Sequence, residues 1–293
     1  MEYRIALAQV APRLGDVEAN LEIAADAVRR AASQGAALTV LPELALTGYL
    51  LQDLVPEVAM RADDPRLLGI GGGAAGMAVA AGFVEETDDH RYCNSVALVR
   101  DGALLGLHRK VYLPTYGLFD EGRFTRAGDR VRTHDAGAPI GRLGLSVCED
   151  FWHASLPMLQ ALDGASLLVN VAAGPSRAPG SDAGLQAIAG WHKMQDTYAL
   201  LGTVPVAFCN RVGNEEGLTF WGGSRLLAAD GSTVVEAPLW EEALVVGSLD
   251  TDDLRMQRYG LPLLADERLE LVRRELDRII SERAGIDGTP NPA

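Results

Sequence analysis

The chain has 293 residues, with 40 Asp plus Glu against 26 Lys plus Arg, a formal net charge of −14, and 48% hydrophobic residues. The acidic balance excludes a sequence-independent nucleic-acid binder, which needs a cationic surface for phosphates, and the apolar content excludes wholesale disorder. No apolar run approaches the roughly 20 residues of a membrane-spanning helix, and the N-terminus lacks a signal peptide's basic start, so we expect a cytoplasmic protein that binds neither nucleic acid nor membrane.

The first third of the chain alternates segments of strand and helix character. Residues 3–10 predict a strand, residues 18–33 a helix with an apolar face, and residues 36–41 a buried strand that Pro42 ends. Further strands are predicted over 77–84, 95–100 and 103–108. Asp101-Gly102 joins the last two as a two-residue hairpin turn.

The rest of the chain continues in the same way. Strands are predicted over 141–147, 166–171 and 204–210, with helices near 155–162 and 184–201 between them. Three short strands close the set at 225–228, 233–236 and 244–249, with Asp230-Gly231 as another hairpin turn. This mixture of hairpins and strand–helix crossovers indicates a layered α/β protein rather than a purely parallel doubly wound sheet.

A single domain over residues 1–260 is expected, because no linker-like stretch interrupts it. Residues 261–293 form a C-terminal helix and a loose tail in this interpretation. The helix is predicted over 266–283, and its apolar stripe consists of Leu269, Val272, Leu276 and Ile279. The stripe packs either on the body of the domain or on a second subunit.

Two features resemble known functional motifs but lack the surrounding sequence that those motifs require. Gly71, Gly73 and Gly76 satisfy G-x-G-x-x-G, but a strand follows before any helix could hold a pyrophosphate, so we predict a simple connection. None of the five histidines has metal-ligand spacing, and neither a metal nor another cofactor is expected. His153 follows Cys148 by five residues, but the members of a Cys–His nucleophile pair are usually far apart in sequence.

Three predicted strands end at a reactive side chain: Glu43 behind Pro42, Lys110 beside Arg109, and Cys148 before an acidic turn. Functional groups in layered α/β proteins gather beyond strand ends, so the three can meet, although each alone is unremarkable. The chain has 24 arginines and only two lysines. A lysine retained at position 110 therefore suggests a need for a compact ammonium.

The three cysteines cannot all pair, which fits a reducing compartment and leaves room for one working thiol. Cys93 and Cys209 stand in apolar runs and are interpreted as inert small hydrophobic residues. Cys148, by contrast, leaves a buried strand and enters an acidic turn.

The sequences LPELALTGY around Glu43, HRKVYLP around Lys110 and GLSVCEDFW around Cys148 resemble the Glu–Lys–Cys constellation of the nitrilase, or carbon–nitrogen hydrolase, superfamily. The resemblance covers residues 1 to about 258. The Cys-Glu-Asp-x-Trp form is most similar to the glutamine-hydrolysing amidase domain of glutamine-dependent NAD synthetase. This resemblance implies a four-layer αββα sandwich and hydrolysis of carbon–nitrogen bonds in linear amides.

It also implies roles for the residues. Glu43 would be the general base, and Cys148 the nucleophile that forms a thioester as ammonia leaves. Lys110 and the backbone N–H of Glu149 would hold the oxyanion, and Lys110 would also favour the Cys148 thiolate. Glu121 matches the family's second glutamate, but Phe124-Thr125 follows it one residue sooner than in the family pattern, and a shortened turn could re-aim its side chain.

The resemblance further places a group of side chains around the substrate: Tyr49, Tyr116, Phe119, Trp152 and Asn170. Arg177 either pairs with an acidic group of the substrate or is an exposed loop arginine. Family members commonly form dimers and larger assemblies, which implies a homo-oligomer.

Three functions remain open at this stage. NAD synthetase has a second, ATP-using domain with a Ser-Gly-Gly-x-Asp-Ser loop that these 293 residues do not contain, so we expect that this chain alone does not make NAD. It would be a free-standing amidase for a small linear amide, with glutamine a leading candidate, or a glutaminase subunit that supplies ammonia to a separate NAD synthetase. A non-catalytic binding or regulatory relative is disfavoured because Glu43, Lys110 and Cys148 are all present.

Overall fold

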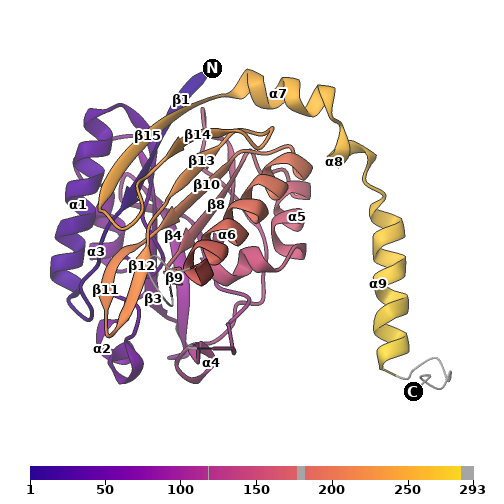
Figure 1. Cartoon of the computed structure of the whole chain (residues 1–293). Helices are drawn as coiled ribbons and strands as arrows, with labels where there is room; N and C mark the ends of the chain where they lie inside the picture. The colour runs from indigo at the N-terminus through magenta and orange to yellow at the C-terminus, as the bar shows by residue number, and fades with distance from the viewer. Residues whose placement is uncertain (118, 177–181, 285–293) are drawn as a thin grey trace.

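Two six-stranded sheets face each other, and helices cover the outer face of each (Figure 1). This computed structural model describes residues 1–117, 119–176 and 182–284. The layers are α, β, β and α, so the sandwich implied by the sequence resemblance is confirmed.

The first sheet has the order β15-β1-β2-β3-β4-β5. β1, β2 and β3 run parallel, while β4, β5 and β15 add antiparallel neighbours. Helix α1 (Val17–Ser33) makes the crossover from β1 to β2. The strand bounds are β1 Glu2–Gln9, β2 Ala36–Val40, β3 Ala78–Glu86, β4 Tyr92–Arg100, β5 Ala103–Arg109 and β15 Ala243–Asp250.

The second sheet has the order β14-β13-β10-β8-β7-β6, with β7, β8 and β10 parallel. Helices α5 (Ser155–Leu162) and α6 (Asp182–Leu201) connect these three strands and cover the outer face. The strand bounds are β6 Thr133–Asp135, β7 Arg142–Val147, β8 Leu167–Ala172, β10 Val206–Asn210, β13 Arg225–Leu227 and β14 Thr233–Glu236.

A small third sheet, β11-β12-β9, was not predicted from the sequence. It consists of β9 (Pro175–Ser176), β11 (Val212–Glu215) and β12 (Leu218–Trp221). Its central turn is Glu216-Gly217, with φ of +46° and +83°. Two positive φ values are the signature of a type I′ hairpin turn, in which glutamate is an unusual first residue.

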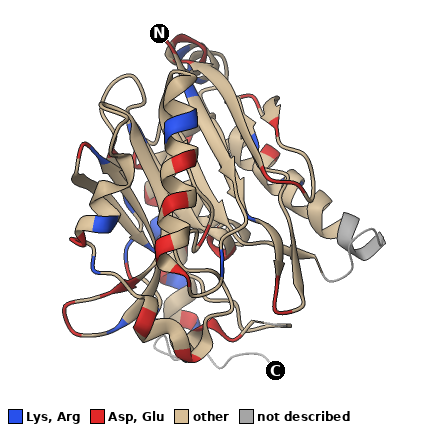
Figure 2. Ribbon diagram, turned by 90° about the vertical axis from the view of Figure 1, so that its left-hand side faces the viewer, with Lys and Arg blue, Asp and Glu red and all other residues tan. Residues whose placement is uncertain are grey.

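Side chains alternate between the two faces of a strand, so each strand of the first sheet contributes to two cores. One core lies between the sheets, and the other lies between the sheet and its covering helix. Ile5 and Leu7 of β1 point into the core between the sheets, whereas Ala6 and Ala8 pack against α1. Small residues at the second face allow the helix to approach the sheet closely. Acidic and basic positions colour the ribbon of α1 red and blue in Figure 2. The exposed charged residues of this helix are Glu18, Glu22, Asp26, Arg29 and Arg30.

Short elements fill the connections. The G-x-G-x-x-G stretch forms a single 3₁₀ turn, η2 (Gly69–Gly71), and a loop that enters β3 directly, so the predicted connection is confirmed.

In the described part of the chain, no helix is long and apolar enough to cross a membrane. The remaining elements are η1 Gln52–Leu54, α2 Val55–Val58, α3 Pro65–Leu68, α4 Glu121–Phe124, η3 Cys148–Trp152, α7 Thr251–Gly260, α8 Leu263–Asp266 and α9 Leu269–Arg283.

The C-terminal helix α9 projects away from the sandwich (Figure 1). It starts at Leu269 rather than at 266, because α8 ends at Asp266 and the chain is extended at Glu267, where ψ is 127°. Leu269 and Leu276 of the apolar stripe are 53% and 52% exposed. Of the two packing modes left open by the sequence, docking on the body of the same chain is therefore not observed.

Candidate active site

The structure brings Glu43 and Lys110 together in a fully buried ion pair. Glu43 follows the end of β2, and Lys110 follows the end of β5 directly. The Lys110 Nζ donates to Glu43 Oε1 at 2.9 Å, and neither side chain is exposed. Cys148 follows the end of β7 and is close enough that both charges shift its pKa. The three strand ends therefore meet, as predicted.

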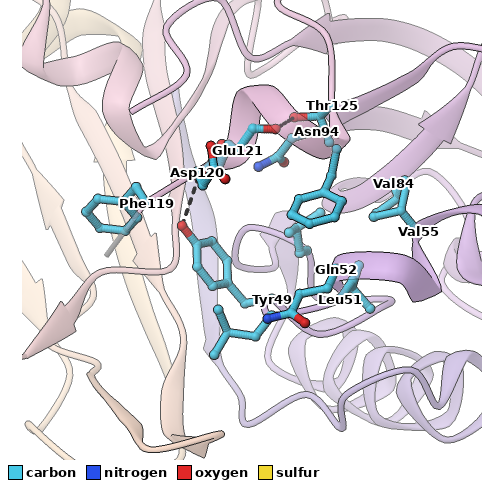
Figure 3. A pocket seen from close by; sticks show the side chains of 13 residues that line it. Tyr49, Leu51, Gln52, Val55, Val84, Asn94, Phe119, Asp120, Glu121 and Thr125 are labelled. Carbon is cyan, nitrogen blue, oxygen red and sulfur yellow. Dashed lines mark hydrogen bonds between the residues drawn. The ribbon is translucent and has the colours of Figure 1, made fainter. Parts of the chain in front are cut away.

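Glu121 completes the cluster in spite of the shortened turn after it. The turn forms the short helix α4, which begins at Glu121 itself. Glu121 Oε1 accepts a hydrogen bond from Lys110 Nζ at 2.8 Å. It accepts another from the Tyr49 hydroxyl, also at 2.8 Å (Figure 3). The Glu121 side chain thus lies against Lys110. The turn after it is one residue shorter than in the family pattern, but this does not point the side chain away from the lysine.

Asn94 is a member of this cluster that the sequence analysis missed. Its Nδ2 donates to Glu43 Oε1 at 2.7 Å, and the residue is only 2% exposed. The available signal was a carboxamide inside the mostly buried strand β4, because a buried amide requires a polar partner. The N–H of Ala173, just beyond β8, also donates to Glu43 at 2.7 Å.

The surroundings keep Lys110 charged. Burial alone would lower the pKa of Lys110, but Glu121 and Glu43 together raise it well above its ordinary value. Burial raises the pKa of Glu121, and Lys110 offsets part of that shift. A permanent ammonium among carboxylates and a thiol suits the stabilisation of negative charge that develops during a reaction.

The pKa of the Cys148 thiol is raised by its surroundings. Burial and the Glu43 carboxylate raise its pKa well above the usual value, and the lowering by Lys110 is smaller. Lys110 thus acts in the direction that the sequence resemblance implied, towards the thiolate, but burial and Glu43 outweigh it. Cys148 also has φ +46°, a left-handed conformation that typically costs a side-chain-bearing residue about 1–3 kcal/mol. Such strain persists only where the surrounding contacts fix the turn.

Glu149 supplies a second acidic group beside the nucleophile. It is 8% exposed, and its Oε2 accepts a hydrogen bond from the Tyr116 hydroxyl at 2.8 Å. Burial raises the pKa of Glu149, and the bond from Tyr116 lowers it by less. The backbone N–H of Glu149 lies in the first turn of η3, where N–H groups lack acceptors within the helix.

The remaining predicted binding residues lie in three different settings. Phe119 packs edge-on against Tyr116, with ring centroids 5.6 Å apart. Trp152 is 44% exposed and packs on Trp191, and Asn170 donates to Ser146 Oγ at 3.0 Å on the helix-covered side of β8. Their contact with substrate stays a prediction. Arg177 lies outside the described residues.

A cavity of about 140 Å³ lies beside Glu121 (Figure 3). Tyr49, Asn94, Phe119 and Glu121 line it, and the remaining wall is mostly apolar: Leu44, Leu51, Val55, Val84 and Phe124. Glu121 Oε2 and Asn94 Oδ1 are buried and have no hydrogen-bond partner among the described residues. These two acceptors suit a group that donates N–H or O–H bonds.

Comparison with known proteins agrees with this geometry. Residues 4–259 match the carbon–nitrogen hydrolase family. The chain is 33% identical over 259 residues to a glutamine-dependent NAD(+) synthetase of Thermotoga maritima, covering 85% of this chain and 42% of that protein. It is 29% identical over 273 residues to an N-carbamoylputrescine amidase of Solanum lycopersicum, covering 88% of this chain and 90% of the other.

A mutant amidase from Nesterenkonia sp. AN1 has a similar structure, with a TM-score of 0.76, 27% identity, and coverage of 93% of this chain and 96% of that one. In that structure the acetamide moiety of fluoroacetamide is covalently added at the active-site cysteine. The present chain belongs to the carbon–nitrogen hydrolase family. It is an amidase-type hydrolase of the nitrilase superfamily that acts on carbon–nitrogen bonds.

Proposed function

We propose that this protein hydrolyses a small linear amide to an acid and ammonia through a thioester on Cys148, with glutamine the leading candidate. One observation carries the proposal. The Lys110 ammonium is fixed between the Glu43 and Glu121 carboxylates, at the strand ends where the half-buried Cys148 thiol stands in a strained turn. This arrangement provides a base, an anion-stabilising cation and a nucleophile in one water-poor site.

The chemistry follows from the charges. Glu43 takes the thiol proton while Cys148 Sγ attacks the amide carbon, which agrees with the raised pKa of this thiol. The Lys110 Nζ and the N–H of Glu149 hold the oxyanion. The C–N bond breaks as Glu43 returns the proton to nitrogen, and ammonia leaves. A water molecule activated by Glu43 then cleaves the thioester and releases the acid.

Glu149 supports a substrate with a cationic group. A mostly buried carboxylate next to the nucleophile is suited to pair with an ammonium. Glutamine and N-carbamoylputrescine both carry an ammonium at neutral pH, and relatives named for reactions of each match this chain. Glutamine is preferred because the NAD synthetases give the stronger matches.

A second candidate function is that of a glutaminase subunit that delivers ammonia to a separate synthetase. Its support is the similarity to glutamine-dependent NAD synthetases, and the chain spans 42–52% of the length of those relatives. Mixing the protein with a synthetase that accepts free ammonia distinguishes the candidates. Glutamine-supported NAD formation together with a stable complex would favour the subunit, whereas ammonia release without association would favour the free-standing amidase.

The test of the main proposal is ammonia release from a panel of glutamine, N-carbamoylputrescine and simple aliphatic amides. We expect at least one of them to be hydrolysed, and Cys148→Ala to abolish the activity. Acid-quenched mass spectrometry should show an adduct on Cys148 whose mass equals the substrate's acid half. Full activity of Cys148→Ala would contradict the thiol mechanism, and no ammonia from any amide or nitrile would favour the non-catalytic relative.

A further inference from the structure

Asp150, two residues after the proposed nucleophile, is completely buried and reaches across to another strand end. Its Oδ1 accepts hydrogen bonds from the backbone N–H groups of Val111 and Tyr112, both at 3.0 Å. These two residues immediately follow Lys110. One carboxylate oxygen therefore fixes the backbone on the C-terminal side of the lysine.

The other oxygen fixes the backbone on the N-terminal side of the nucleophile. Asp150 Oδ2 accepts the N–H of Val147 at 2.9 Å, and Val147 immediately precedes Cys148. The same oxygen lies 2.8 Å from Nε2 of His108, which is 3% exposed and stands two residues before Lys110. A single side chain thus joins the two segments that carry the proposed nucleophile and the proposed oxyanion partner.

The chemistry of this contact requires an ionised carboxylate. The three backbone N–H groups can only donate, and the His108 ring satisfies the fourth position when its proton is on Nε2. An asparagine in the same place would turn its NH₂ towards one pair of donors. Two buried donors would then face each other, and their hydrogen bonds would be lost.

We propose that Asp150, supported by His108, is a positioning residue that sets the separation between the Cys148 thiol and the Lys110 ammonium. The proposal rests on the proposed function, since it assigns catalysis to those two groups. Cys148 has a strained φ of +46°, and such a conformation must be held by its surroundings. The bonds to Val147 on one side and to Val111 and Tyr112 on the other provide that restraint.

The experiment is a single-turnover measurement on Asp150→Asn, with the amide that the wild type hydrolyses fastest. The amplitude reports the fraction of correctly folded protein, and the rate constant reports the chemistry in each folded molecule. A purely structural role would lower the amplitude and leave the rate constant unchanged. We expect the acylation rate constant to fall about 100-fold, the effect typical of an approximately 1 Å misplacement, with KM within about 3-fold of the wild type.

The matched control is Glu85→Gln. Glu85 is 2% exposed and accepts hydrogen bonds from Ser95 and Arg109, so this change also neutralises a buried carboxylate near the end of β5. It has no hydrogen bond to the turn that contains Cys148. We expect its single-turnover rate constant to stay within about 3-fold of the wild type, even if its thermal stability falls.

Two His108 variants keep the proposal testable if Asp150→Asn does not fold. His108→Leu removes one of the four donors, and we expect the rate constant to fall about 10-fold. His108→Gln retains a donor and should lie closer to the wild type. An unchanged rate constant in Asp150→Asn and His108→Leu, or an equal loss in Glu85→Gln, would overturn the positioning role. Activity in Cys148→Ala would instead overturn the proposed function.

Discussion

At the scale of single residues, Glu43 is held by three groups that come from three different parts of the chain. Asn94 and Lys110 donate to Oε1, and the N–H of Ala173 donates to Oε2. Together these bonds fix the direction of the carboxylate, and only the contact with Lys110 was predicted from the sequence. The Glu43 charge has a second consequence, since it raises the pKa of Cys148.

Glu43→Gln should therefore separate thiol ionisation from turnover. Removal of the negative charge should lower the pKa of Cys148, because Lys110 then acts on the thiol without the opposing carboxylate. Turnover should nevertheless fall by about 100-fold or more, because the general base is lost. The check is peptide-resolved alkylation of Cys148 against pH, with a reagent that contains no amide. An unchanged or raised thiol pKa would contradict this account.

The raised pKa of Glu149 predicts a pH dependence that varies with the substrate. Burial raises the pKa above 4.5, so the carboxylate becomes neutral at a higher pH than an exposed glutamate. As the pH falls through this pKa, the anion that pairs with an ammonium-bearing substrate is lost. The acid limb of kcat/KM should then lie at a higher pH for glutamine than for an uncharged aliphatic amide. Coincident limbs would show that Glu149 does not bind the ammonium.

At the scale of elements, several predicted turns and strands are confirmed because their determinants are local. Asp101-Gly102 has φ of +50° and +78° and joins β4 to β5, as a two-residue turn of this composition should. The β11–β12 hairpin was missed because Glu216 takes the first left-handed position. Asparagine, aspartate and glycine are the residues that normally signal such a turn.

Gly82 of β3 is a packing requirement for the active site. A Cβ at this position would lie 2.5 Å from Pro42 O and Leu44 N, and 2.8 Å from the Cα of Glu43. Gly82→Ala should therefore lower the free energy of unfolding by about 1–3 kcal/mol and displace the general base. We expect a loss of kcat of about 10-fold or more, because displacement of a catalytic group by about 1 Å can cost 100-fold.

The control for this prediction is Gly71→Ala. Gly71 is also buried, but an added Cβ would only meet the Val79 side chain at an ordinary 3.9 Å. Its kcat should match the wild type, with a small change in the melting temperature. Equal effects of the two substitutions on kcat would refute the close approach of β3 to Glu43 as the cause. Tolerance at Gly71 would also agree with its place in a simple connection.

At the scale of the whole molecule, two apolar surfaces have no partner among the residues that the structure describes. One is the stripe of α9, and the other is a face of α5 and α6, where Met158, Leu159 and Leu201 are 39%, 48% and 57% exposed. An apolar groove lined by Pro157, Tyr198 and Leu263, among others, runs beside this face. We propose that a second copy of the chain covers both surfaces, which would make the protein a homo-oligomer.

Leu201→Glu tests this assembly. A charge in a buried interface is costly, so the variant should have a lower molecular mass in solution than the wild type. Sedimentation and light scattering measure this mass. Leu104→Glu is the control, because Leu104 is 38% exposed on β5 and does not belong to the α5–α6 face. A wild type that is monomeric at micromolar concentration would contradict the proposal directly.

The sequence by itself determined the layered α/β class, most strands and helices, and Glu43, Lys110 and Cys148 as a set. Those features depend on local patterns, since alternation, turn residues and short motifs lie within a few positions of one another. Only the tertiary structure showed that Glu121 stays on Lys110 despite a shortened turn, and that Asn94 and Asp150 hold the cluster from other strands. It also showed that burial and Glu43 raise the pKa of Cys148 by more than Lys110 lowers it. Burial and distances between strand ends decide these properties, and both arise only when the two sheets pack together.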